Sequence, residues 1–363
     1  MSEAPRVTIV TPTFNHERFI GQCVESVFAQ TYPHWEMVIV DDGSSDATAD
    51  VVERYSDPRI RLIRQANQGI HALAATYNRA LAESSGELVA ILEGDDFWPS
   101  YKLEQQVPAF ADPSVVVVSG LTSIVGPDGS YRMVTPNQPL DETAIHNRPV
   151  GSAAGFMMDP ERLIYTFPVA TMVRRSALDR IGGFQQPSHS RVVDYPTILR
   201  LTIEGEFRFL PHVLGMWRRH EGSTTSKHLP EILDSAYRTT FEFVRSHRHR
   251  LPLSDAELDA IELRWEYFLG NLSVLRMRML AGTGKIRPAL QAAREGRIYR
   301  RTRMTDLSLR LSILSLRLGR SPEWLFRVAG RPDWRRLVAF DSGDQVVTEE
   351  DLNRPRPLCR WRG

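Results

Sequence analysis

The sequence predicts an α/β protein built on a mixed, mostly parallel sheet flanked by helices, with an all-helical part after it. In the first half of the 363 residues, short apolar runs alternate with segments whose apolar residues recur at helical spacing. This alternation is typical of a parallel sheet covered by helices. Two of the runs, 37–40 and 88–92, end directly in paired carboxylates. Ligand sites of α/β proteins form where strands end in this way.

The first part of the chain is expected to form a βαβαβαβ series. The first helix shows the pattern best, because Ile20, Cys23, Val24 and Val27 share one face. The expected strands are 7–10, 37–40, 60–63 and 88–92, and the expected helices are 20–28, 47–55 and 71–82.

Beyond residue 100 the pattern becomes less regular. Residues 136–160 are rich in Pro, Gly and Asn and are expected to form a loop. Strands are expected at 115–118, 131–134, 169–173, 207–210 and 213–217, and helices at 176–181 and 195–204.

Three regions follow from this pattern: an α/β domain over 1–228, a helical extension over 229–320 and an irregular tail over 321–363. Strand signals are absent from the extension, where Pro or Gly separates the apolar-periodic segments. Its expected helices are 230–248, 254–281, 286–296 and 304–318.

Composition excludes several classes of protein. A net charge of +1 gives no overall attraction to nucleic acid. The two cysteines, Cys23 and Cys359, do not have the spacing of metal ligands. No secretory leader and no bilayer-length apolar run are visible, so we expect a cytoplasmic protein.

The segment 304–318 combines leucine stripes with arginines. Its surroundings are basic, since 285–336 holds fourteen Lys and Arg against four Asp and Glu. One interpretation is a helix buried between two neighbours. The other is a helix that makes peripheral contact with an anionic membrane. The leucines and isoleucine form two stripes, Leu307, Leu311, Leu314 and Leu318 on one and Leu309, Ile313 and Leu316 on the other.

The segment Glu93-Gly94-Asp95-Asp96 offers hard oxygen ligands within four residues. Mg²⁺ and Mn²⁺ prefer such ligands and often share them with substrate phosphates. The alternative is an acidic surface turn. A second acidic pair after another buried strand favours the cation site.

The segment Asp41-Asp42-Gly43-Ser44 follows strand 37–40. Carboxylates at strand ends hydrogen-bond the hydroxyls of a ribose in nucleotide sites. The alternative is an Asx turn that leads into the next helix. Both interpretations hold together if Ser44 or Asp46 caps the next helix while Asp42 faces the ligand.

At these positions the sequence resembles glycosyltransferase family 2. The resemblance is specific over about residues 5–110, where it rests on the segments 7–15, 26–33 and 38–46, on Asn67-Gln68-Gly69, on Asn78 and on Asp95-Asp96. A weaker match continues through Gly182-Gly183-Phe184, Val193-Asp194-Tyr195 and Trp217-Arg218-Arg219-His220. Two positions depart from the family, because Glu93 stands where Asp is frequent and Val193 where an acidic residue is frequent.

The resemblance implies a GT-A fold and an inverting glycosyltransferase that uses a nucleotide-sugar donor, most often a UDP-sugar, and a divalent cation, Mn²⁺ or Mg²⁺. The implied acceptor is a glycan or a lipid-linked glycan in polysaccharide or cell-envelope assembly. The implied metal ligands are Asp96, Asp95 and His220. The implied nucleotide-sugar site consists of Thr11, Pro12, Thr13, Asn15, Asp41, Asp42, Asn67, Gly69, Asn78 and Asp95.

Inverting transfer also needs a base, because the acceptor hydroxyl must lose a proton on the face opposite the leaving group. Asp194 matches the family's acidic element and directly precedes a helix. We therefore expect Asp194 to be the base, and the alternative is that it only caps the helix. Arg218 or His220 would reach the donor diphosphate.

Two other functions remain open at this point. A nucleotidyltransferase also uses carboxylates and Mg²⁺ on a similar sheet, and it would release pyrophosphate. A catalytically silent scaffold would bind a sugar nucleotide without transferring the sugar. A Rossmann dehydrogenase is disfavoured because no G-x-G-x-x-G follows the first strand.

Overall fold

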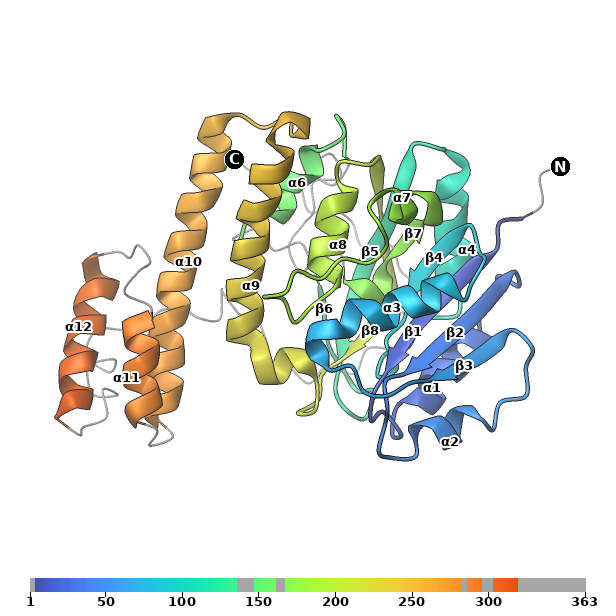
Figure 1. Cartoon of the computed structure of the whole chain (residues 1–363), viewed down its shortest axis with the longest axis horizontal. Helices are drawn as coiled ribbons and strands as arrows, with labels where there is room; N and C mark the ends of the chain where they lie inside the picture. The colour runs from blue at the N-terminus through green and yellow to red at the C-terminus, as the bar shows by residue number, and fades with distance from the viewer. Residues whose placement is uncertain (1–3, 136–146, 161–166, 283–285, 296–302, 319–363) are drawn as a thin grey trace.

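An eight-stranded mixed sheet with helices on its faces forms one part of the molecule, and a helical extension lies to one side of it (Figure 1). The computed structural model describes residues 4–135, 147–160, 167–282, 286–295 and 303–318. Within these residues the expected α/β class and the helical C-terminal part are both confirmed.

The first four strands are parallel and lie in the order β3-β2-β1-β4. β1, β2 and β4 are buried along their whole length, as parallel strands under helices are, whereas β3 at the edge of the sheet is only partly buried. The strands are β1 (Val7–Thr13), β2 (Trp35–Asp41), β3 (Ile60–Arg64) and β4 (Leu88–Ile91), and the helices between them are α1 (Ile20–Phe28), α2 (Thr48–Val52) and α3 (Leu73–Ala82). The predicted βαβαβαβ series is confirmed.

The second half of the sheet is built around the long strand β5 (Val115–Val125). Strands β7 (Met172–Arg174) and β6 (Tyr131–Thr135) pair antiparallel with it, whereas β8 (Glu206–Arg218) pairs parallel with it. The prediction of two late strands is wrong, since β8 is continuous. Its register skips Pro211 and His212, because proline cannot donate a hydrogen bond to the ladder.

Two other segments differ from the prediction. The strand expected at 169–173 is a 3₁₀ turn, η3 (Pro168–Ala170), followed by β7. The loop expected at 136–160 contains the helix α6 (Ser152–Met157), while residues 136–146 lie outside the described part. Tertiary contact explains α6, because a Cβ on Gly155 would lie 2.8 Å from the Leu253 side chain. A residue with a side chain would not allow this approach.

The first of the remaining helices was not predicted, and the others agree with the prediction except at their ends. They are α4 (Lys102–Gln106), α7 (Arg175–Arg180), α8 (Asp194–Leu201), α9 (Thr224–His247), α10 (Asp255–Gly282), α11 (Ile286–Glu295) and α12 (Arg303–Arg317). Helix α9 begins earlier than expected and is kinked at His228, two residues before Pro230. Proline disfavours helical backbone in the residue before it, which accounts for a break in this turn.

The helices α9 and α10 share the hydrophobic core on one face of the sheet. Phe243 of α9 and Trp265 of α10 belong to the same buried cluster as Val10 and Val173 of the sheet. The Trp265 indole also donates to the Met158 carbonyl at 2.6 Å. The division at residue 228 stays a prediction, and the described core is continuous across it. The tail predicted for 321–363 lies outside the described residues.

The outermost helix, α12, buries one side only. Ile313 and Leu316 pack into a small cluster with α10 and α11, whereas Leu314 is 55% and Leu318 68% exposed. Leu311 is exposed as well, and the side chains of Leu307 and Leu309 lie outside those described. The stripe of Leu311, Leu314 and Leu318 is therefore exposed and is not covered as in a helix between two neighbours, whereas Ile313 and Leu316 of the other stripe are buried. None of the described helices has the length and apolar character that a bilayer crossing requires.

A buried lysine fixes the segment after β4. Lys102 is fully buried, donates to Gln106 and lies 4.6 Å from the centre of the Trp98 ring. Gln106 in turn donates to the carbonyls of Val118 and Ala170. Burial holds the pKa of Lys102 well below its ordinary value.

This lysine predicts a pH-dependent stability. Folding lowers the pKa of Lys102, so below the ordinary lysine pKa the unfolded chain holds a proton that the folded chain lacks. The free energy of unfolding therefore increases as pH rises toward that ordinary pKa. The Lys102→Met variant lacks this effect. With each pH unit, the free energy of unfolding of the natural chain should therefore gain up to about 1.4 kcal/mol relative to that of the variant. Urea denaturation at pH 7, 8 and 9 measures it. The exposed Lys227→Met is the control, and parallel curves for all three proteins would contradict the prediction.

Candidate active site

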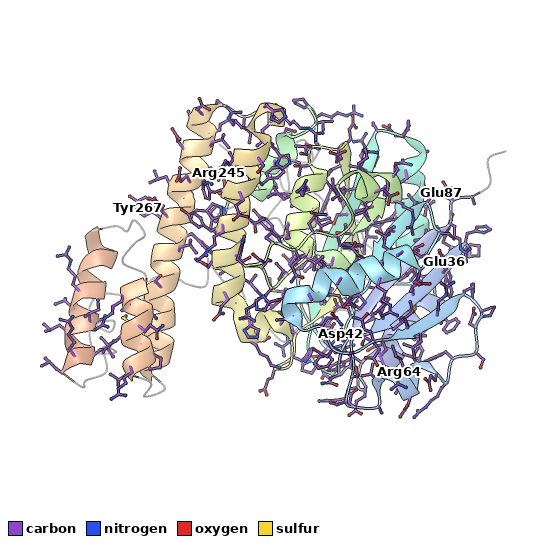
Figure 2. All side chains as sticks on the ribbon, in the orientation of Figure 1. Glu36, Asp42, Arg64, Glu87, Arg245 and Tyr267 are labelled. Atoms are coloured by element: carbon purple, nitrogen blue, oxygen red, sulfur yellow. The ribbon has the colours of Figure 1, made fainter. Side chains whose placement is uncertain are left out.

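The carboxyl ends of β1, β2, β4 and β8 meet at one edge of the sheet. β1, β2 and β4 are parallel neighbours, and β8 runs beside β5 in the same direction. Figure 2 shows Asp42, just after β2, at the end of the sheet opposite Glu36, near the start of that strand. The topology therefore brings together acidic residues that the sequence predicted at separate strand ends.

The acidic segment after β4 forms a compact cluster. Glu93, Asp95 and Asp96 each offer a carboxylate oxygen within 4.8 Å of the others. Burial and the neighbouring Asp95 raise the pKa of Glu93 to about 8 and raise that of Asp96 well above its usual range. A divalent cation among these oxygens would relieve the repulsion between them. The donor set, all hard oxygens, fits Mg²⁺ or Mn²⁺.

Arg218 holds the acidic turn after β4 in place. Its backbone N–H donates to Asp96 Oδ1 at 2.8 Å, and its Nε donates to the Asp95 carbonyl at 2.8 Å. The guanidinium also donates to the carbonyl of Pro127 and to Gln22, and it is only 2% exposed. The prediction that Arg218 reaches a diphosphate is not supported by this geometry, because the side chain is committed to the fold.

Two histidines flank Asp95. His220 Nε2 lies 3.1 Å from Asp95 Oδ2, and His16 Nε2 lies 3.9 Å from the same oxygen. Burial alone would raise the pKa of Asp95, but attraction to His16 and the hydrogen bond with His220 hold it below its ordinary value. The predicted neighbours Asp95 and His220 are thus brought together, and His16 joins them from the loop after β1, where no pattern in the sequence predicts a functional residue.

Asp194 lies at the first residue of α8 and belongs to the same electrostatic environment. Its negative charge contributes to the raised pKa values of both Glu93 and Tyr77. Burial raises the pKa of Asp194 itself to about 6, although backbone N–H groups at the start of α8 oppose that shift. A carboxylate with this pKa is ionised at neutral pH and is a better proton acceptor than an exposed aspartate.

Tyr77 connects α3 to the acidic cluster. Its hydroxyl donates to Glu93 Oε1 at 2.5 Å. Burial and the Glu93 charge raise the Tyr77 pKa well above its usual value, so the hydroxyl stays protonated as a donor. Nothing local in the sequence distinguishes Tyr77 from a tyrosine of the core.

The acidic pair after β2 divides into two roles. Asp41 Oδ1 accepts from the backbone N–H and the hydroxyl of Ser44, which makes the expected Asx turn. Asp42 Oδ1 accepts from Gln65 Nε2 at 2.7 Å and from the Gln68 N–H at 3.0 Å. Asp41 is shaping the turn, while the Asp42 carboxylate is oriented by the loop after β3.

The predicted nucleoside-side residues of the first loop hold that loop in place. Asn15, at φ +55°, accepts from the Ser45 N–H through its side chain. Thr13 accepts from the Asp42 N–H through its carbonyl. Thr11 and Pro12 are buried within β1. Direct contact of these four residues with a donor stays a prediction.

The other three predicted nucleotide-side residues also have contacts within the protein. The Asn67 side chain donates to the Asp42 carbonyl at 2.9 Å, and Gly69 has a φ of +78° that favours glycine. Both ends of the Asn78 amide pair with the backbone of Phe184. Asn78 thus fixes the segment before Asp194, and its predicted contact with the donor remains untested.

The family model for glycosyl transferase family 2 matches residues 8–182. Among curated relatives, the putative teichuronic acid biosynthesis glycosyltransferase TuaG of Bacillus subtilis is 37% identical over 209 residues, which are 55% of this chain and 73% of TuaG. A UDP-Glc:α-D-GlcNAc-diphosphoundecaprenol β-1,3-glucosyltransferase, WfgD of Escherichia coli, is 34% identical over 145 residues, 38% of this chain and 56% of WfgD. The match therefore spans only about half the length of the second relative.

Solved structures share the fold at low sequence identity. Residues 1–349 of S. aureus TarS in complex with UDP-GlcNAc superpose with a TM-score of 0.55 at 19% identity, covering 87% of this chain and 92% of TarS. The mannosyltransferase PcManGT from Pyrobaculum calidifontis, solved with GDP-Man and Mn²⁺, gives 0.52 at 20% identity, covering 94% and 89%. Together with the family model and the TuaG match, this similarity shows that the chain belongs to glycosyltransferase family 2 and has the GT-A fold.

Proposed function

We propose that this glycosyltransferase is a metal-dependent inverting enzyme that transfers a sugar from a UDP-sugar to a glycan or a lipid-linked acceptor. The observation that carries the proposal is the meeting of the acidic cluster after β4 with His220 and Asp194, which come from distant parts of the chain. Such a site provides both a place for a metal-bound diphosphate and a separate proton acceptor.

The named relatives support the donor and the biosynthetic setting. TuaG is named for teichuronic acid biosynthesis, and WfgD for a UDP-Glc donor and a diphosphoundecaprenol-linked acceptor. TarS was solved with UDP and with UDP-GlcNAc. We therefore assign a UDP-sugar donor and a role in polysaccharide or cell-envelope assembly.

The reaction follows from the two halves of the site. Asp194 takes the proton of the acceptor hydroxyl, whose oxygen then bonds to the anomeric carbon as the bond from that carbon to the diphosphate oxygen breaks. A divalent cation held by Asp95, Asp96 and His220 would neutralise the charge of the leaving nucleoside diphosphate. Because attack comes from the face opposite the leaving group, the configuration inverts.

The nucleoside is assigned to the loops after β1, β2 and β3. The Asp42 carboxylate, oriented by Gln65 and Gln68, is proposed to hydrogen-bond the base. Thr11, Pro12, Thr13, Asn15, Asp41, Asn67 and Gly69 are proposed to shape the surrounding wall, and Asn78 supports it through Phe184. Family membership favours glycosyl transfer over nucleotidyl transfer and over a silent scaffold.

We also propose that the protein is cytoplasmic and contacts an anionic membrane surface through α12. This helix lies at the outer end of the extension, on the far side of α10 and α11 from the sheet (Figure 1). Leu311 and Leu314 of this helix and Leu318 directly after it are exposed, and Arg310 and Arg317 are their neighbours in the sequence. Leucines would enter the lipid surface while arginines face anionic headgroups, which suits an enzyme with a lipid-linked acceptor.

Donor binding is the first test. A UDP-sugar at one hundred times its dissociation constant should add about 2.7 kcal/mol to stability. A thermal-shift screen of nucleotide sugars should therefore show a rise in melting temperature that is larger with Mn²⁺ present. Asp95→Asn should remove the metal-dependent part, whereas Asp259→Asn, which alters an exposed aspartate of α10, should keep it. If no nucleotide sugar gives a metal-dependent shift, the donor site is wrongly assigned.

Asp194 gives a second test. Asp194→Asn should lower kcat by about 10²-fold to 10⁴-fold while donor binding is unchanged, because only the proton acceptor is lost. In the natural enzyme kcat should fall about tenfold per pH unit below about pH 6, where Asp194 becomes protonated, and level off above it. Product formation measured from pH 5 to 9 tests this, with the exposed Asp179→Asn as control. Near-normal turnover by Asp194→Asn would refute the base assignment.

Membrane contact is tested by flotation with liposomes. The natural chain should float with vesicles of anionic phospholipid, less so at high salt, since each arginine near the surface contributes about 1 kcal/mol. Leu314→Glu combined with Leu318→Glu should abolish flotation. The matched control is Leu263→Glu, because Leu263 of α10 is also a partly exposed leucine, at 39%. Equal flotation of both variants would reject α12 as the contact surface.

A further inference from the structure

Two contacts, one to the backbone and one to the ring, hold His16 in one orientation. It follows Asn15 in the loop after β1, and its backbone N–H donates to Thr48 Oγ1 at 2.8 Å. Its ring nitrogen Nδ1 lies 3.1 Å from Thr13 Oγ1. When Nδ1 donates to that hydroxyl, the other nitrogen, Nε2, carries a lone pair. This is the arrangement in which a protein orients a histidine as a metal ligand.

The lone-pair nitrogen is directed toward Asp95. His16 Nε2 lies 3.9 Å and His220 Nε2 lies 3.1 Å from the same oxygen, Asp95 Oδ2. Atoms that bind one ion at about 2.1 Å are separated by roughly 3 to 4.2 Å. Both separations from Asp95 therefore match those of ligands that share a cation.

Gly94 makes this approach possible. A Cβ at residue 94 would lie 2.9 Å from His16 Nδ1 and would collide with the Thr13 side chain. A side chain here would push the loop after β1 away from the loop after β4. The glycine thus allows a histidine from one loop to approach a carboxylate from the other.

We propose that His16 is a ligand of the divalent cation, and that His16 and His220 together make this site select Mn²⁺ over Mg²⁺. The inference rests on the proposed metal-dependent function and adds a residue and a preference to it. Imidazole nitrogen binds first-row transition ions well, whereas Mg²⁺ prefers oxygen ligands and retains its water. With two imidazole nitrogens beside Asp95, a Mg²⁺ ion would have nitrogen in place of two of its preferred oxygen ligands.

Manganese binding tests the proposal without an activity assay. Pulsed electron paramagnetic resonance of Mn²⁺ added to the natural chain, with and without UDP, should show coupling to imidazole nitrogen. His16→Gln should weaken that coupling and lower Mn²⁺ affinity about tenfold or more, because removing even an outer partner of a ligand costs about 10-fold to 100-fold. Affinity for Mg²⁺ should change much less, so the ratio of the two affinities falls.

The controls separate this inference from the proposed function. His34→Gln alters an exposed histidine and should behave like the natural chain. Melting curves check folding, and His16→Asn replaces His16→Gln if the latter is unfolded. If the natural chain binds Mn²⁺ with UDP but the His16 variants keep the same nitrogen coupling and metal ratio, the inference is overturned while the proposed function stands. If Mn²⁺ binds with His16 coupling but UDP does not bind, the donor assignment fails instead. Absence of any Mn²⁺ binding overturns the inference.

Discussion

Three carboxylates just after β4, one buried and two partly buried, impose the constraint on which the rest of this site depends. Carboxylates so close together repel each other, and burial removes the water that would otherwise stabilise their charges. The turn that carries them must therefore be held by strong contacts. Arg218 supplies them, since its backbone and side chain bond to both Asp95 and Asp96 and its guanidinium lies over the rings of Phe19 and Phe97.

The same constraint explains why so many distant segments converge here. Tyr77 from α3 donates to Glu93, and His220 from the end of β8 pairs with Asp95. Each contact lowers the cost of burying negative charge, and each also positions a group that the chemistry needs. Stabilising the cluster and assembling the site are therefore achieved by the same residues. Asp194 is the exception, because its charge adds to the repulsion, which is consistent with retention for chemistry rather than for stability.

The sequence predicted those features that are local or periodic. The strand ends at Asp41-Asp42 and Asp95-Asp96 follow from short apolar runs, and their convergence follows from parallel strands. The direction of a side chain does not follow from such patterns. Arg218 points into the fold rather than toward a ligand, and nothing in the order of residues indicates this. His16 lies in a polar stretch with no periodicity, and its importance depends on a contact across Gly94 that exists only in three dimensions.

The helical extension is coupled to the catalytic side of the molecule. The hydroxyls of Tyr195, next to Asp194, and of Thr240 on α9 lie 2.6 Å apart, and His189 in the preceding loop lies 3.3 Å from Thr239 of the same helix. These contacts hold the start of α8 against α9. Because a base acts only when its oxygen is within hydrogen-bond reach of the acceptor, small displacements of α8 would be costly. Helix α9 therefore supports the placement of Asp194, although no residue of α9 belongs to the proposed site.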